Sequence, residues 1–306
     1  MIIHLLGATT STGQAFITSM SNRNDVRLRI YKRSPSGGTY NDGIIDLNNP
    51  SMCQFNCSGG SNNILVSFAP IWLVSKLISY LSRELPNELR KMQGVIVCSS
   101  SSTLTKRFAF TKHSSDLAYK LFASEQTIVD CCKSFNLPCQ ILRPTLIYGS
   151  SGTHHDKNIS VLLRLLRLLP LLLIPSDTGL RQPLHCRQLA EVAIFFARKM
   201  VDSDATIFNK KDILKSDILT FGGDEILSYK DMILAIQSSR PVGDCSRNCL
   251  LVPVSNRLFF ALVAPLAIIS PSIFEALLRM CANLGNFTRV CDIMGTEPNK
   301  FPLADN

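Results

Sequence analysis

The sequence lacks any apolar run long enough to span a membrane. Two stretches come nearest to one, residues 161–175 and residues 258–269. The first carries Arg164 and Arg167, and the second contains Pro265 and falls short of the roughly 20 apolar residues that a spanning helix needs. We therefore expect neither stretch to cross a bilayer, although attachment to a membrane surface stays open.

Paired cysteine spacings typical of a metal site are also absent. Of the eleven cysteines, Cys131 and Cys132 are adjacent, and Cys53 and Cys57 have no second pair nearby. We predict no metal site and interpret the thiols as small buried hydrophobic groups. Because the first residues do not read as a signal peptide, we expect reduced cysteines in a cytoplasmic protein.

The sequence has no block of basic residues, although its formal net charge is +9. Lysines and arginines are scattered and are not interleaved with aromatic residues, so we expect no nucleic-acid partner. An anionic nucleotide ligand accounts for the charge equally well. Internal repeats are lacking too, and 306 residues with 46% hydrophobic side chains can build one large or two medium domains.

The chain begins with an apolar run, Ile2 to Leu6, followed by a glycine turn. The run predicts a buried parallel strand, and the residues from Gly13 onward predict a helix. Backbone N–H groups at the start of such a helix would face a pyrophosphate. The cofactor-binding residues predicted in this turn are Gly7, Thr9, Thr10, Ser11, Thr12 and Gly13. Two glycines six residues apart could equally serve a tight turn alone.

Thr10 makes this turn unusual. The spacing is G-x-x-T-x-x-G, with Thr10 where the usual dinucleotide-binding pattern has its middle glycine. A Cβ atom there narrows the approach to the phosphates, while the hydroxyl could donate a hydrogen bond to one of them. The sequence leaves open which of the two effects wins.

The second and third predicted strands end in charged residues. Residues 26–31 lead into Lys32 and Arg33 with no acidic residue at the tip. An Asp or Glu there would bind the ribose 2′-hydroxyl of NAD, whereas Arg33 suits the 2′-phosphate of NADP, so NADP(H) is favoured over NAD(H). A solvated basic strand end is the alternative. Asp46 ends the third strand, where its carboxylate could accept a hydrogen bond from an adenine amino group or cap the next turn.

Four successive serines follow the fifth predicted strand. Residues 95–98 are apolar, and Ser99 to Ser102 come directly after them. Hydroxyl groups at the carboxyl end of a parallel strand point into the ligand crevice of such a sheet. A polar passage from strand to loop is the alternative, and it would rarely need four serines.

Taken in order, these features resemble the extended and atypical short-chain dehydrogenase/reductase superfamily. Within it, the chain is most similar to NAD(P)-dependent epimerases and dehydratases that act on nucleotide sugars. The segments that carry the resemblance are the glycine turn, Asp46-Leu47, Ala69-Pro70, the serine-ended strand, Arg143-Pro-Thr-Leu-Ile-Tyr148-Gly149, Arg181-Gln-Pro-Leu-His185 and Phe221-Gly-Gly-Asp-Glu-Ile-Leu-Ser-Tyr229. The resemblance covers nearly the whole chain.

The resemblance implies an α/β fold, a doubly wound parallel sheet of the Rossmann type with a small C-terminal substrate lobe. Residues 1–150 would form the NAD(P)-binding domain. Residues 151–306 would form mainly the substrate lobe, with segments that return to the Rossmann sheet. Leu47 and Ala69 are implied as further cofactor-binding residues.

The catalytic residues of the family are matched only in part. Ser101 falls at the position of the catalytic serine. The family's acid/base is a tyrosine with a lysine four residues on, one helical turn away. Tyr119 is the candidate tyrosine, but Ala123 stands four residues after it.

An alignment on Glu125 gives no dyad either. It places Leu117 at the tyrosine position and Leu121 at the lysine position, so we expect the tyrosine and lysine pair to be absent. Three residues of the preceding segment could replace it, and their spacing selects none of them: Lys106, Lys112 and His113.

In the second half of the chain, Asn158, Arg181 and His185 fall where the family binds substrate, although His185 could equally be a structural histidine. The function implied is that of an NAD(P)-dependent oxidoreductase or epimerase-like protein that transfers hydride to or from a nucleotide sugar. A catalytically impaired NADP-binding structural or sensor protein is one alternative. A peripheral membrane or assembly subunit is another, and a homodimer stays open.

Overall fold

The computed structural model describes residues 1–21, 23–33, 43–53, 57, 62–106, 109, 111–151, 157–201 and 218–303, without the side chains of residues 157 and 158. The strands are β1 (Ile2–Leu6), β2 (Arg27–Lys32), β3 (Gly43–Ile44), β4 (Asn63–Ser67), β5 (Met92–Cys98), β6 (Cys139–Pro144), β7 (Ile147–Tyr148), β8 (Leu171–Pro175), β9 (Leu180–Arg181), β10 (Leu184–His185), β11 (Ile218–Gly222), β12 (Leu227–Ser228), β13 (Leu250–Val254) and β14 (Thr288–Arg289).

The helices alternate with these strands in the first half and gather in the second. They are α1 (Ser11–Ser21), α2 (Ile71–Glu84), α3 (Pro86–Arg90), α4 (Ser102–Thr105), α5 (Lys112–Ser134), α6 (Lys157–Leu168), α7 (Cys186–Val201), α9 (Tyr229–Ser239), α10 (Asn256–Val263), α11 (Leu266–Ile269), α12 (Pro271–Leu278) and α13 (Val290–Met294). The described residues also contain three 3-10 helices, η1 (Pro50–Met52), η2 (Cys245–Asn248) and η3 (Arg279–Cys281).

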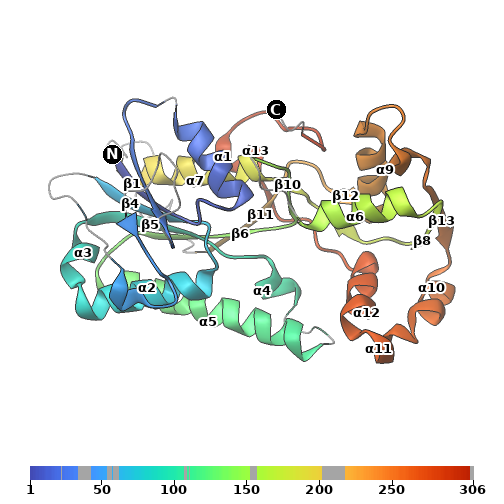
Figure 1. Ribbon diagram of the computed structural model, residues 1–306, viewed down its shortest axis with the longest axis horizontal. Coiled ribbons are helices and arrows are strands. Elements are labelled where there is room, and N and C mark those ends of the chain that lie inside the picture. The colour runs from blue at the N-terminus through green and yellow to red at the C-terminus, as the bar shows by residue number, and fades with distance from the viewer. Residues whose placement is uncertain are drawn as a thin grey trace.

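Eight strands form one parallel sheet in the order β3-β2-β1-β4-β5-β6-β11-β14. The order reverses at β1, which pairs with β2 on one side and with β4 on the other. Helices α1 and α7 cover one face, and α2 and α5 cover the other (Figure 1). This is the doubly wound arrangement of dinucleotide-binding sheets, so the predicted α/β fold class is confirmed.

The central strands are continuous apolar runs because helices cover both of their faces. All five residues of β1 and all five of β4 are buried. His4 is the polar exception within β1. Its Nδ1 lies 2.8 Å from Oη of Tyr31, and its Nε2 lies 3.1 Å from Oδ1 of Asn63. Hydrogen bonding of both ring nitrogens lets the imidazole stay inside the sheet.

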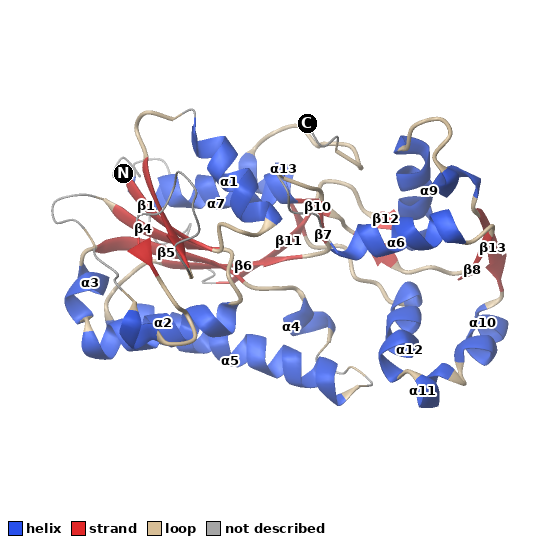
Figure 2. Ribbon diagram, viewed as in Figure 1, coloured by secondary structure: helices blue, strands red, loops and turns tan. Residues whose placement is uncertain are grey.

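After β6 the chain leaves the sheet and builds a separate lobe. Figure 2 shows this lobe as the helices and short strands around β8 and β13, beyond the ends of the large sheet. Strand β8 pairs with β13 in parallel, and α6, α9 and α10 surround the pair. Strands β11 and β14 then return to the edge of the large sheet.

Two buried polar side chains fasten the lobe to the sheet. Asp224 accepts hydrogen bonds from the backbone N–H of Cys291 at 2.7 Å and of Asn299 at 2.9 Å. Nε2 of Gln182 donates to the carbonyl of Gly223 at 2.8 Å, and Oε1 of Gln182 accepts from the N–H of Phe287 at 2.9 Å. These bonds tie the segment after β11 to the last thirty residues of the chain.

The apolar stretch at residues 161–175 is not one element. It divides at Pro170 into the end of α6 and the strand β8. Within the described part of the chain, no helix is both long enough and apolar enough to cross a membrane.

Candidate functional site

The glycine turn lies at the point where the strand order reverses. Gly7 follows β1 with φ +80°, and a Cβ atom on it would lie 2.4 Å from the backbone N of Ala69, which follows β4. Only glycine allows the two strand ends to approach this closely. Helix α1 begins four residues later at Ser11, and its first N–H groups have no partner within the helix. The turn therefore has the shape and polarity of an anion cradle.

The hydroxyl of Thr10 is committed to the turn itself. It donates to the carbonyl of Gly7 at 2.9 Å and accepts from the backbone N–H of Gly13 at 3.0 Å. Thr10 is thus the N-cap of α1, and its hydroxyl is not directed at a phosphate as the sequence suggested it could be. The cap satisfies one of the helix's first N–H groups and leaves those of Ser11 and Thr12 for a ligand.

The predicted adenosine-binding residues lie beyond β2 and β3. Arg33 follows the carboxyl end of β2 and is exposed. Asp46 follows β3, and its Oδ1 accepts from the backbone N–H of Asn48 at 3.1 Å. The carboxylate therefore caps the next turn, the second of the two roles foreseen for it. Leu47 is half-buried against the core on the α2 side of the sheet.

The serine segment after β5 is hydrogen-bonded to one member of a buried ion pair. Glu125 of α5 is fully buried and pairs with Arg143 of β6 through Nε at 2.9 Å and through Nη2. The same carboxylate accepts hydrogen bonds from the hydroxyls of Ser99 and Thr103. The hydrogen bonds from Ser99 and Thr103 hold the segment to this carboxylate. Removing one partner of the ion pair would leave an uncompensated buried charge.

Ser101 lies on the wall of a cavity of about 600 Å³ between the sheet and the lobe. Its backbone N–H donates to the carbonyl of Pro144 at 2.9 Å, and it precedes α4 without capping that helix. The polar and charged residues that line the cavity with it are Ser100, Ser102, Thr105, Lys106, Thr145, Arg181, Tyr229 and Arg279. Residues from both halves of the chain thus face one space.

Arg181 is the best-held cation of this cavity. Its Nη1 donates to the carbonyls of Leu180 at 2.7 Å and Ala282 at 2.6 Å, and its Nη2 donates to the carbonyl of Arg279. The guanidinium lies 5.0 Å from the ring centroid of Tyr229, a cation–π contact. Burial lowers the pKa of Arg181 to about 10, which still leaves it charged at neutral pH.

Two proton-carrying groups of the cavity are shifted in opposite senses. Burial lowers the pKa of Lys106, and the nearby charge of Arg279 acts in the same direction. Burial raises the pKa of Tyr229, against the opposing effect of Arg181. Lys106 is therefore moved toward its neutral, basic form, whereas Tyr229 is held in its protonated form.

Tyr119 does not line this cavity. It is 59% exposed on α5, because the residues that α5 buries are spaced at Ala118, Leu121 and Glu125, one position away from it. Lys112 and His113 are exposed in the first turn of α5 and do not line the cavity either. Of the three replacements that the sequence offered, the structure brings only Lys106 into the same space as Ser101.

His185 lies behind the cavity wall and not on it. It is fully buried, its ring meets that of Tyr148 edge-on at 5.0 Å, and its Nδ1 accepts from the N–H of Arg187 at 3.2 Å. A Cβ atom on Gly149 would lie 2.3 Å from its Nε2. The two sequence segments that end in Gly149 and His185 thus meet through the pairing of β7 with β10. Asn158 is in the first turn of α6, and its side chain lies outside the described residues.

Two residues of the cavity were not singled out as site residues from the sequence. Tyr229 follows the N-cap Ser228 and begins α9, and Arg279 begins η3. Neither has a local sequence signal, because each reaches the cavity only through the packing of the lobe. The ion pair between Glu125 and Arg143 was missed for the same reason.

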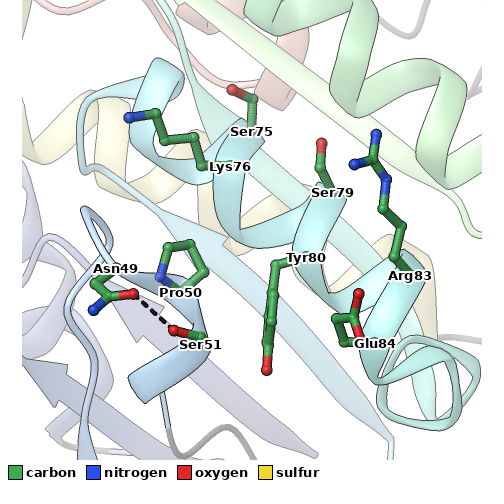
Figure 3. A pocket seen from close by; sticks show the side chains of 9 residues that line it. All are labelled: Asn49, Pro50, Ser51, Ser75, Lys76, Ser79, Tyr80, Arg83 and Glu84. Carbon is green, nitrogen blue, oxygen red and sulfur yellow. Dashed lines mark hydrogen bonds between the residues drawn. The ribbon is translucent and has the colours of Figure 1, made fainter.

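A second cavity, of about 460 Å³, lies between η1 and α2. Figure 3 shows Tyr80 and Glu84 of α2 on the side that faces η1, where Oγ of Ser51 donates to Oδ1 of Asn49 at 2.7 Å. None of the predicted site residues lines it. Among the described residues no group of three or more His, Cys, Asp and Glu side chains could hold a metal ion, and all eleven cysteines are free thiols.

The N-cap role of Thr10 predicts a matched pair of variants. Thr10→Val removes both hydrogen bonds while keeping the branched shape, and should lower the free energy of unfolding by about 1 kcal/mol. Thr10→Ser keeps the hydroxyl and should unfold at nearly the wild-type urea concentration. Equal destabilisation of the two variants in urea titrations would contradict the assignment.

Comparisons with known proteins identify the fold. No family model and no curated protein sequence matches the chain. Among solved structures, UDP-glucuronic acid 4-epimerase from Bacillus cereus, in complex with UDP-glucuronic acid and NAD, is 13% identical, with a TM-score of 0.60 over 98% of this chain and 95% of that chain. The dTDP-glucose 4,6-dehydratase from Bacillus anthracis, in complex with NAD, is 13% identical, with a TM-score of 0.57 over 98% and 92%.

A third similar structure, a human epimerase family protein with NADPH, is 11% identical, with a TM-score of 0.58 over 99% of this chain and 96% of that chain. All three similarities extend over nearly the full length of both chains. These similarities show the fold: the chain shares the α/β fold of these epimerase and dehydratase structures.

Proposed function

We propose that the protein binds a nicotinamide dinucleotide and a nucleotide sugar and transfers hydride between them. The observation that carries this proposal is the cavity in which Ser101, Lys106 and Arg181 meet, beyond the carboxyl ends of β5 and β6 and so at the same edge of the sheet as the reversal of the strand order. In open α/β sheets the ligand crevice lies at that reversal, outside the carboxyl ends of the strands. Similar structures bind NAD or NADPH, and some of them bind UDP-sugars.

The glycine turn fits the pyrophosphate of a dinucleotide. Gly7 has no side chain where one would fill the approach to Ala69, and the N–H groups of Ser11 and Thr12 begin α1. Sheet order then orients the ligand. Arg33 follows β2 on one side of β1, whereas Ser101 follows β5 on the other, so the adenosine half would lie toward Arg33 and the nicotinamide half toward Ser101.

Lys106 is the residue that we assign to proton transfer. It lines the same cavity as Ser101, five residues further along the chain. Burial lowers its pKa, which favours the neutral amine that can accept a proton. In the oxidation direction, the hydroxyl proton of the sugar passes to the neutral amine while the carbon-bound hydrogen leaves as a hydride. Ser101 donates a hydrogen bond to the same sugar oxygen. A bound nicotinamide supplies or accepts the hydride at C4.

Arg279 and Arg181 make the cavity suitable for an anionic substrate. Both guanidinium groups line it, and Glu275 is the nearest acidic side chain that acts on Arg279. Carbonyl groups hold Arg181 in place, so it acts mainly as a fixed positive charge, and Arg279 is the candidate for direct contact with a diphosphate. Asn158, at the start of α6, is proposed to bind the same ligand.

The catalytic assignment predicts a change in the pH profile. Wild-type turnover of a UDP-sugar such as UDP-glucuronic acid should rise with pH until Lys106 is deprotonated, below the ordinary lysine range. Lys106→Met should lose that rise and reduce kcat by about 10²–10⁴-fold. Ser101→Ala should also abolish turnover, with dinucleotide affinity nearly unchanged in both variants.

The control for this experiment is Lys76→Met, which removes an exposed lysine from the second cavity. It should leave both turnover and the pH profile as they are. Full activity of Lys106→Met, with an unaltered pH profile, would remove Lys106 from the mechanism. Dinucleotide binding without turnover in the wild type would instead favour the sensor or structural role.

The cofactor preference has its own test. Arg33→Ala should weaken NADPH binding by about tenfold, because a charge-assisted contact to the 2′-phosphate is lost. NADH binding should change little. Arg27→Ala, an exposed arginine at the opposite end of β2, should affect neither cofactor. Equal weakening of NADPH and NADH by Arg33→Ala, measured by fluorescence titration, would remove the 2′-phosphate assignment.

A further inference from the structure

The lobe carries an exposed apolar end that the proposed reaction does not use. We define the α10–α12 hairpin as residues 256–278, three short helices joined at Pro265 and Pro271. Ile268 is 90% exposed and Ile269 is 77% exposed, side by side in α11. The other large exposed apolar residues of the hairpin are Leu258, Phe260, Leu262 and Ile273. In Figure 1 α11 lies at the outer edge of the lobe, away from the large sheet.

The inner side of the same hairpin is firmly packed. Phe259 and Val263 of α10 are buried against Ile174 of β8 and Met280 of η3. The hairpin is therefore part of the folded lobe. Apolar side chains occur on its outer side as well as on its inner side. A helix at a protein surface normally presents polar side chains to water. The outer side of α10–α12 departs from that rule and calls for a partner.

Few charged residues lie at this surface. The carboxylate of Asp177 lies beside the start of α10, where its Oδ2 accepts from Nδ2 of Asn256 at 3.3 Å. No acidic residue occurs between Cys245 and Phe274. Glu275 is buried and faces inward, where its carboxylate accepts hydrogen bonds from the hydroxyl and backbone N–H of Thr111. Arg257 is exposed in the first turn of α10, and the chain as a whole has a net charge of +9. The net positive charge of the whole chain suits an apolar phase that has an anionic boundary.

The dimensions also fit a membrane interface. Helices α10, α11 and α12 have 8, 4 and 8 residues, so none can span a bilayer. Eight residues of α-helix extend about 12 Å. With Ile268 and Ile269 inserted to a depth of about 5–10 Å, Arg257 at the far end of α10 would lie at the level of the headgroups.

A second copy of the chain suits this surface less well. A stable interface between proteins buries about 800 Å² on each partner and needs a complementary surface. The end of the hairpin is the four-residue helix α11, where Ile268 and Ile269 are its most exposed apolar side chains. A fluid bilayer accepts an apolar end without needing a matching shape.

We propose that the end of the α10–α12 hairpin inserts into the surface of an anionic lipid bilayer, with Ile268 and Ile269 in the acyl region and Arg257 among the headgroups. Ala276 of the hairpin and Arg279, directly after it, line the cavity, so this contact would hold the candidate active site next to the membrane. The inference does not depend on the proposed function.

The test is flotation of the full chain with lipid vesicles in a density gradient. Vesicles of phosphatidylcholine with about one third phosphatidylserine should carry the wild-type protein upward, and vesicles of phosphatidylcholine alone should carry less of it. The double variant Ile268→Ser/Ile269→Ser should lose at least about tenfold in binding, since burial of each isoleucine contributes about that factor or more. Arg257→Ala should weaken binding only to the anionic vesicles.

The matched control is Leu234→Ser/Val242→Ser, which removes two exposed apolar side chains around α9. It should float like the wild type. Unchanged thermal unfolding midpoints would show that both double variants are folded. The proposal is overturned if the wild-type protein stays at the bottom of the gradient with both kinds of vesicle, or if the α11 variant floats as well as the control. It is also overturned if the α11 substitutions abolish a dimer seen by sedimentation while flotation is absent.

Discussion

The approach of Gly7 to Ala69 determines where the proposed dinucleotide would bind. The two residues follow β1 and β4, the strands between which the order of the sheet reverses, and a Cβ atom on Gly7 would lie 2.4 Å from the backbone N of Ala69. Because the strand ends meet this closely, α1 begins directly over the crevice and directs its first N–H groups toward it. Thr10 completes the arrangement as the N-cap of α1. A glycine at that position would leave more space for a phosphate. The threonine instead stabilises the start of α1 through its two hydrogen bonds.

The second half of the site depends on how the lobe is fastened to the sheet. Asp224 and Gln182 join the segment after β11 to the end of the chain, and Arg181 holds η3 through the carbonyl groups of Arg279 and Ala282. These contacts bring Tyr229 and Arg279 to the cavity that Ser101 lines. The buried pair of Glu125 and Arg143 fixes the serine segment from the opposite side. The alignment on Glu125 places Leu117 at the position of the family's tyrosine, and Lys106, which lines the cavity, is the basic group that we propose instead.

The sequence was most informative where a residue's environment is determined by its neighbours along the chain. The strand predicted at Ile2–Leu6 has those bounds, because a mainly apolar run followed by a glycine fits a strand covered on both faces. Ser228 follows the same rule, since a serine directly before a helix favours an N-cap, and its hydroxyl accepts from the N–H of Asp231 at 3.0 Å. The cavity partners were out of reach, since Tyr229 and Arg279 come from segments more than a hundred residues after Ser101 and are placed by packing alone. The hydrogen bonds of Thr10 were missed for a different reason. Its hydroxyl can bond to the backbone of the turn or to a ligand, and the spacing of residues in the sequence does not distinguish the two.

The most direct test of the account is a calorimetric titration of nucleotide-free protein with NADPH and NADH, repeated on the Gly7→Ala variant. The account predicts that the wild type binds a dinucleotide, and that the added methyl group abolishes binding by forcing Ala69 and the β4 end away from the turn. Gly243→Ala, at a glycine whose Cβ would meet no atom within 4 Å, should bind as the wild type does. If the wild type binds neither dinucleotide, or if Gly7→Ala binds as well as the control, the glycine turn is not a cofactor site and the proposed reaction is wrong.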